Sequence, residues 1–228
     1  MKRLIVGMSG ATGAIYGIRL LEVLSKSDIE THLVISEAAQ KTIRMETPWT
    51  VKQVKALAHT CYDSRDIGAN IASGSFLNEG MVIIPCAIKT LSGIANSYND
   101  NLLVRAADVA IKEKRKLVVV ARETPFHKGH LRLMMDAADL GATILPPVPA
   151  FYCLPQTIDD LINHLVGKVL DMFHIEHNLF YRWGSRETES GMAAIREGKK
   201  NVDEKEWRED LPYHPIYSGP HIKGPVSH

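Results

Sequence analysis

Short apolar runs without polar alternation recur along this 228-residue chain and are separated by stretches of helical character. Such runs are typical of parallel strands that helices cover on both faces. The predicted strands are residues 4–6, 33–35, 81–84, 117–120 and 143–145. The predicted helices are residues 18–24, 37–45, 51–58, 100–114 and 158–173. Strands and helices in this order predict an α/β fold with a doubly wound, three-layer parallel sheet.

The first predicted strand runs directly into a glycine turn. Gly7, Gly10 and Gly13 have the spacing G-x-x-G-x-x-G, and a helical stretch follows. Glycines let the backbone approach a ligand closely, and the first amides of a helix favour an anion. The spacing differs from the dinucleotide pattern G-x-G-x-x-G, and the second strand is followed by Ser36 instead of an acid that could hold a ribose. A mononucleotide therefore fits better than NAD, although a tight turn without a ligand would have the same pattern.

Polar side chains follow several of the predicted strands. In open α/β sheets, ligands bind beyond the carboxyl ends of the strands. The segments at these ends are residues 9–13, Ser36, 85–90, 122–125 and 146–152. Each of these residues also has an ordinary structural explanation. Ser36 could be simply a helix cap, Arg122 could form a local ion pair with Glu123, and Tyr152 could be simply a packing residue. Their common placement at one sheet edge nevertheless predicts a ligand site there.

Composition excludes several classes of function. A formal net charge of +1 argues against a nucleic-acid surface. The three cysteines lack C-x-x-C spacing, which argues against a disulfide framework or a thiolate zinc site and fits a reducing cytoplasm. Histidine pairs at residues 127/130 and 174/177 have no convincing further ligand, so no metal is expected. No segment approaches the roughly 20 apolar residues that a membrane span requires.

Five segments of the chain occur in the same order in the UbiX-type flavin prenyltransferases: residues 7–14, 72–76, 84–94, 122–125 and 145–152. From residue 1 to about residue 183 the chain resembles this family, and in particular the branch found beside hydroxyarylic acid decarboxylases. The resemblance implies a flavodoxin-like or Rossmann-like fold and a homo-oligomer, usually described as a dodecamer. It also implies transfer of a dimethylallyl group from dimethylallyl phosphate to reduced FMN. The product, prenylated FMN, would serve a separate UbiD-type decarboxylase.

The resemblance further implies roles for individual residues. FMN would contact Gly10, Ala11, Thr12, Ser36, Ala87, Ile88, Lys89, Thr90 and Arg122. The prenyl phosphate would contact Tyr152 and Lys168, with Arg105 and Lys112 near the same anion. Glu46 would face the flavin as a proton-transferring acid and would complete a catalytic set with Tyr152 and Lys168. Negative charge grows on a departing phosphate, so cations and a phenol beside it would favour the transition state.

Two positions depart from the family's pattern. Ala87 stands where many relatives have serine, and Lys168 stands where arginine is common. Lysine keeps the charge but lacks the bidentate fork of arginine. Two other functions are therefore considered: an FMN-dependent decarboxylase of the cysteine-decarboxylase group, although no P-A-S-A-N-T-like loop is present, and a non-catalytic flavin carrier or accessory subunit of a decarboxylase.

The end of the chain differs from the rest. Residues 184–228 are charged and rich in proline, and such a segment cannot bury a core of its own. We therefore expect an FMN-binding domain over residues 1–183 and a C-terminal arm over residues 184–228. The arm would wrap a neighbouring subunit or stay disordered.

Overall fold

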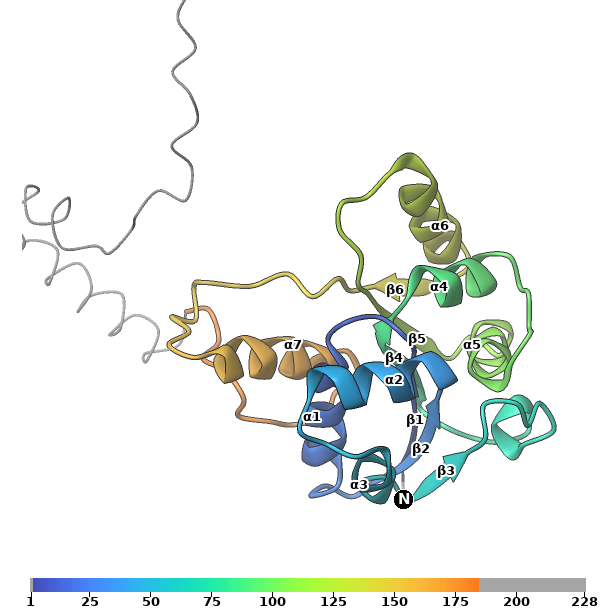
Figure 1. Cartoon of the computed structure of the whole chain (residues 1–228), viewed down its shortest axis with the longest axis horizontal. Coiled ribbons are helices and arrows are strands. Elements are labelled where there is room, and N and C mark those ends of the chain that lie inside the picture. Colours follow the sequence, from blue (N-terminus) through green and yellow to red (C-terminus); the bar gives the residue numbers. More distant parts are fainter. Residues whose placement is uncertain (1, 185–228) are drawn as a thin grey trace, which may run out of the picture. The chain divides into compact units, whose positions relative to one another are not determined.

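A computed structural model describes residues 2–184 of the protein (Figure 1). Its centre is an all-parallel six-stranded sheet with the order β3-β2-β1-β4-β5-β6. The strands are β1 (Lys2–Met8), β2 (Ile29–Ile35), β3 (Thr60–Tyr62), β4 (Gly80–Cys86), β5 (Lys116–Ala121) and β6 (Ala142–Ile144). The expected arm lies outside the described residues, apart from Gly184.

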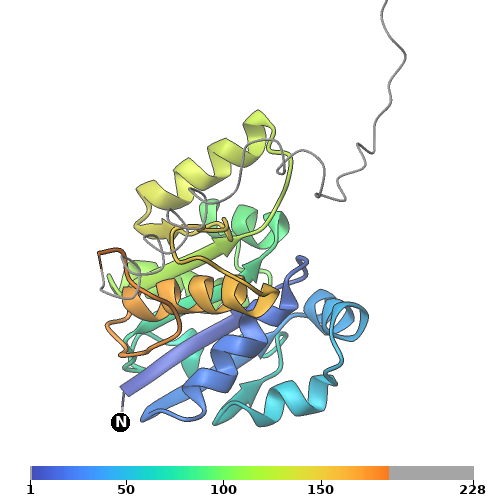
Figure 2. The ribbon, with the colours of Figure 1, turned by 90° about the vertical axis from the view of Figure 1, so that its left-hand side faces the viewer.

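Helices cover both faces of the sheet. One face carries α1 (Ala14–Leu24), α2 (Glu37–Glu46), α3 (Val51–Ala56) and α7 (Ile158–Met172). The other carries the short 3-10 helix η1 (Asn70–Ala72), α4 (Ile88–Ala95), α5 (Leu102–Lys112) and α6 (Lys128–Asp139). Figure 2 shows α1 and α7 side by side in front of the sheet. The predicted three-layer α/β fold is confirmed.

Two hydrophobic clusters lie on the two faces of the sheet because successive strand side chains point in opposite directions. In β1, Leu4 and Val6 join the cluster under α1 and α7, whereas Ile5 joins the cluster under α4 and α5. Every residue of β4 is buried. Burial on both faces explains why the strands read as continuous apolar runs.

Some elements differ from the sequence-based expectation. Strand β3 and helix α6 were not expected, since β3 has only three residues and α6 fully buries only Ala137. Neither therefore leaves a clear apolar pattern. Helix α5 begins at Leu102 and not at Asp100, because the Asn101 side chain accepts a hydrogen bond from the Val104 amide at 3.1 Å. Asp100 instead lies 3.6 Å from the Lys89 ammonium.

The strand order locates a crevice. From β1 the chain builds β2 and β3 on one side and then crosses to β4 on the other side. The carboxyl ends of β1 and β4 therefore form the topological switch point, where α/β sheets of this order bind ligands. Without the short edge strand β3, the same order is that of the flavodoxin-like sheet. None of the helices between residues 2 and 184 is long and apolar enough to span a membrane.

Candidate functional site

Backbone hydrogen bonds hold four of the five strand-end segments together at the carboxyl edge of the sheet. They run from Ser36 N to Met8 O (2.9 Å), from Ser9 N to Pro85 O (3.1 Å) and from Arg122 N to Cys86 O (3.0 Å). The segments after β1, β2, β4 and β5 are thus neighbours. We call this region the carboxyl-edge site.

Ser9 anchors the centre of the carboxyl-edge site. Its side chain is buried, and Oγ accepts a hydrogen bond from the Ala87 amide at 2.7 Å while it donates to Pro85 O at 3.1 Å. Ser9 therefore fixes the start of α4 against the glycine turn. Sequence reasoning placed Ser9 in the turn but gave it no role. A small hydroxyl residue directly after a buried strand was the available signal.

The glycines of the turn have separate structural reasons. A Cβ atom on Gly10 would lie 2.3 Å from Ala38 Cβ on α2, so this position requires glycine for helix packing whether or not a ligand approaches. Gly13 has φ of 95°, a left-handed conformation that glycine adopts without strain. The tight packing at Gly10 supports the structural explanation of this glycine that the sequence had left open. Its neighbours in the proposed contact set are the buried Ala11 and the exposed Thr12.

Glu46 reaches the glycine turn from the last position of α2. Its Oε2 accepts hydrogen bonds from the Gly13 amide at 2.8 Å and the Ala14 amide at 3.4 Å. A carboxylate thus lies at the amino terminus of α1, where the helix dipole favours negative charge. No hydrogen bond to Oε1 is found in the described part of the chain. The predicted acid therefore lies in the carboxyl-edge site, with one oxygen anchored.

The starts of α2 and α4 differ in their capping. Ser36 Oγ accepts a hydrogen bond from the Ala39 amide at 3.1 Å, so Ser36 is a helix cap as well as a candidate ligand contact. Ala87 offers no side-chain oxygen, and α4 begins without a side-chain cap. The first-turn amides of α4, at Ile88, Lys89 and Thr90, therefore keep donor capacity at the crevice.

Arg122 supplies the cation of this edge. Within the described residues no carboxylate lies at ion-pair distance from its guanidinium. The alternative pairing with Glu123 is absent, because Glu123 accepts a hydrogen bond from the Thr124 amide instead. Burial raises the pKa of the Tyr16 phenol, and the nearby charge of Arg122 opposes that shift. Tyr16, on the first turn of α1, was not foreseen as a neighbour of this site.

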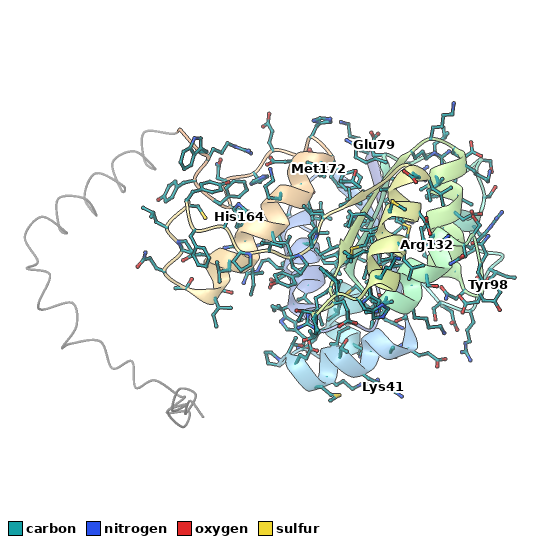
Figure 3. The ribbon with its side chains drawn as sticks, turned by 90° about the horizontal axis from the view of Figure 1, so that it is seen from above. Lys41, Glu79, Tyr98, Arg132, His164 and Met172 are labelled. Carbon is teal, nitrogen blue, oxygen red and sulfur yellow. The ribbon has the colours of Figure 1, made fainter. Side chains whose placement is uncertain are left out.

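Tyr152 and Lys168 make their contacts at helix α7. Tyr152 Oη is 3.1 Å from His164 Nε2 on α7, and Lys168 Nζ is 3.9 Å from Asp171 Oδ2 on the same helix. Helix α7 ends at the opposite, amino edge of the sheet, where Lys116 at the start of β5 donates to the carbonyl of Met172. Figure 3 shows His164 and Met172 on this helix. We call Tyr152, His164 and Lys168 the α7 cluster.

The other two predicted cations lie on α5. Arg105 Nη1 is 3.2 Å from Asp108 Oδ2, and Lys112 contacts Glu113 at the end of the helix. Because β5 starts four residues later at the amino edge, Lys112 lies far from the carboxyl ends of its own strands. One chain therefore does not bring Lys112 to the carboxyl-edge site, and α5 covers the opposite face of the sheet from α7.

Burial raises the pKa of the Cys86 thiol to about 12, which disfavours a thiolate at this strand end. Among residues 2–184, no three histidine, cysteine or acidic side chains come together as a metal site.

Comparisons with known proteins show the family and agree with the fold. A family model described as Flavoprotein matches residues 1–170. Flavin prenyltransferase UbiX from Escherichia coli (strain K12) is 61% identical over 186 residues, which cover 80% of this chain and 98% of the relative. The crystal structure of AnUbiX (PadA1) in complex with FMN and dimethylallyl pyrophosphate has a TM-score of 0.79 at 46% identity, covering 81% of this chain and 98% of that one.

A second solved structure is informative about assembly. A dodecameric FMN-dependent UbiX-like decarboxylase from Escherichia coli O157:H7 has a TM-score of 0.78 at 48% identity. The match covers 80% of this chain and all of the other. Both similarities extend well beyond the glycine turn.

Proposed function

This chain belongs to the family of UbiX-type flavin prenyltransferases, and from that premise we propose that it transfers a dimethylallyl group from dimethylallyl phosphate to reduced FMN. The observation that carries the proposal is the meeting of three groups at one switch point: a guanidinium without a carboxylate partner among residues 2–184, a helix start without a side-chain cap, and an anchored carboxylate. These are the groups that a flavin phosphate and a proton transfer require.

FMN fits the carboxyl-edge site on chemical grounds. The amides at the start of α4 and the Arg122 guanidinium can neutralise a phosphate without a metal ion. Gly10, Ala11, Thr12 and Ser36 border the same crevice across β1 and β2. Reduced FMN would supply the nucleophilic ring atoms that accept the prenyl group.

Glu46 has the geometry of a proton-transferring group. The Gly13 amide holds Oε2, no hydrogen bond to Oε1 is found in the described residues, and we assign to Oε1 the proton exchange during ring closure. The anchoring hydrogen bond also keeps the carboxylate close to the glycine turn. We therefore assign Glu46 the proton transfer and not the anchoring of either ligand.

The prenyl phosphate site is assigned to more than one chain. Tyr152 and Lys168 lie on the α7 side of the molecule, and Arg105 and Lys112 lie on α5. We propose a homo-oligomer, and specifically a dodecamer like the E. coli O157:H7 relative. Such an assembly can place these groups of one subunit beside the carboxyl-edge site of the next. In that arrangement the cations and the phenol would stabilise the departing phosphate.

The proposed product implies a second enzyme that uses it as a cofactor. Prenylated FMN would pass to a UbiD-type aromatic acid decarboxylase, and the chain would work in the cytoplasm. The three unpaired thiols of Cys61, Cys86 and Cys153 support a reducing location.

Mass spectrometry of the flavin tests the proposed activity. Purified protein is incubated anaerobically with reduced FMN and dimethylallyl phosphate, with dimethylallyl pyrophosphate in a parallel arm. A prenyl mass increment on the flavin supports the proposal. Bound but unchanged FMN would indicate a carrier, and carbon dioxide release from a cysteine-containing substrate would indicate the decarboxylase alternative. Exhaustive chelation should leave FMN binding intact.

A further inference from the structure

His164 is a buried histidine in direct contact with a residue of the proposed phosphate site. Only 8% of His164 is exposed, and its Nε2 lies 3.1 Å from Tyr152 Oη. The two rings meet edge to face, with centroids 5.7 Å apart and an interplanar angle of 82°. This contact joins the loop that carries Tyr152 to α7.

The His164 ring also packs against Phe180. The Phe180 ring centroid is 4.7 Å away. Phe180 can approach α7 because position 167 is glycine, where a Cβ atom would lie 2.5 Å from Phe180 Cε1. The imidazole is thus held between Tyr152 and Phe180. A ring confined in this way presents Nε2 in one direction.

The surroundings of His164 favour its neutral imidazole form. Burial lowers the pKa of His164 below its ordinary value, and the positive charge of Lys168 lowers it further, while Asp171 acts in the opposite direction. A neutral imidazole has one N–H donor and one acceptor nitrogen. When Nε2 carries the hydrogen, it donates a hydrogen bond to the phenol oxygen of Tyr152. The hydroxyl hydrogen of Tyr152 then takes no part in the contact with His164.

We propose that His164 is the positioning residue for Tyr152, and that its Nε2 orients the phenol toward the prenyl phosphate. The inference rests on the proposed function, because it needs Tyr152 to contact that substrate. His164 itself touches no substrate. It acts only through the phenol, so its effect must disappear when the phenol oxygen is absent.

A double-mutant cycle on the full-length oligomer tests this dependence. The variants are Tyr152→Phe, His164→Leu and the combination of both, and kcat and KM for dimethylallyl phosphate are measured at saturating reduced FMN. Each single variant should raise KM by about 5- to 10-fold, the size of one hydrogen bond. The double variant should match Tyr152→Phe alone. His164→Gln should recover most of the loss, because its amide nitrogen can donate to the phenol.

The outcomes separate this inference from the proposed function. If His164→Leu raises KM by the same factor in wild type and in the Tyr152→Phe background, its role is purely structural and the inference is overturned. If Tyr152→Phe raises KM and His164→Leu does not, the inference about His164 is overturned while the proposed function stands. A Tyr152→Phe variant that keeps the wild-type KM would overturn the role of Tyr152 as well. If His164→Leu fails to fold, His164→Asn replaces it, since the shorter amide cannot reach Tyr152.

Discussion

The carboxyl-edge site and the α7 cluster are built in different ways. Backbone hydrogen bonds between strand ends hold the first, and most of its groups belong to segments that follow β1, β2, β4 and β5. Side-chain contacts hold the second, such as Tyr152 to His164 and Lys168 to Asp171. The first is a property of the sheet, whereas the second depends on a loop and a helix face.

This difference separates two kinds of binding. A site made by strand ends is preorganised within one chain and suits FMN, which we expect to bind first. We propose that the α7 cluster acts where a second chain faces it. Variants in the two regions should therefore have separable effects on FMN binding and on turnover.

The largest expected effect follows Glu46→Gln. The amide oxygen can still accept from the Gly13 amide, so FMN affinity should stay nearly unchanged, but the group can no longer take a proton. Turnover should fall by about 10²- to 10⁴-fold. Anaerobic stopped-flow flavin spectra measure the adduct and ring-closure steps separately. Glu37→Gln, at the other end of α2, is the control and should turn over normally. Wild-type rates through both steps in Glu46→Gln would make the departing phosphate the base.

The second prediction contrasts two cations. Arg122→Ala should weaken FMN binding by about 10- to 100-fold, because a charged hydrogen-bond partner of the flavin phosphate is removed. Lys168→Ala should leave FMN affinity unchanged and raise KM for dimethylallyl phosphate. Fluorescence titration of FMN and steady-state kinetics measure the two quantities. A loss of FMN affinity in Lys168→Ala would place the α7 side at the flavin and remove the contrast.

The third prediction concerns the rigidity of the carboxyl-edge site. Gly10→Ala should lower the free energy of unfolding by about 1–3 kcal/mol, since its Cβ would overlap Ala38 Cβ. Gly68→Ala is the control, because its nearest neighbour would be Asp66 Oδ1 at 3.5 Å. Urea unfolding measures both. Ala38→Gly should cost less stability in the Gly10→Ala background than in wild type, because it removes the overlapping Cβ, and an equal cost in both backgrounds would show that another contact requires the glycine.

The smallest expected effect is a pH dependence of stability. Burial lowers the folded-state pKa of His32 and of His164, so the unfolded chain binds more protons in acid. Stability is therefore complete above the unfolded pKa of about 6.5 and declines as the pH falls through it. Urea unfolding at pH 7.5 and pH 5.5 should show a smaller acid loss in His164→Gln than in wild type. An unchanged loss in that variant would assign the effect to His32 or to other groups.

Sequence reasoning predicted the carboxyl-edge site better than the α7 cluster. Apolar runs mark strand ends, and a parallel sheet aligns those ends, so Ser36 and Arg122 could be placed together in advance. The contact between Glu46 and Gly13 spans 33 positions and depends on where α2 ends. The contact between Tyr152 and His164 depends on how a proline-rich loop folds back onto α7. The hydrophobic periodicity of the sequence does not predict such long-range side-chain contacts.

The central claim is that one active site combines the carboxyl edge of one chain with the α7 cluster of another. Mixing Arg122→Ala and Lys168→Ala chains, after dissociation and reassembly, tests it directly. Native mass spectrometry confirms that hybrid oligomers form, and flavin prenylation is then measured. At FMN and dimethylallyl phosphate concentrations too low for either variant alone to turn over, random assembly should restore about a quarter of wild-type activity, because one site in four receives both intact halves. Hybrid oligomers with no more activity than the two separate variants would contradict the claim.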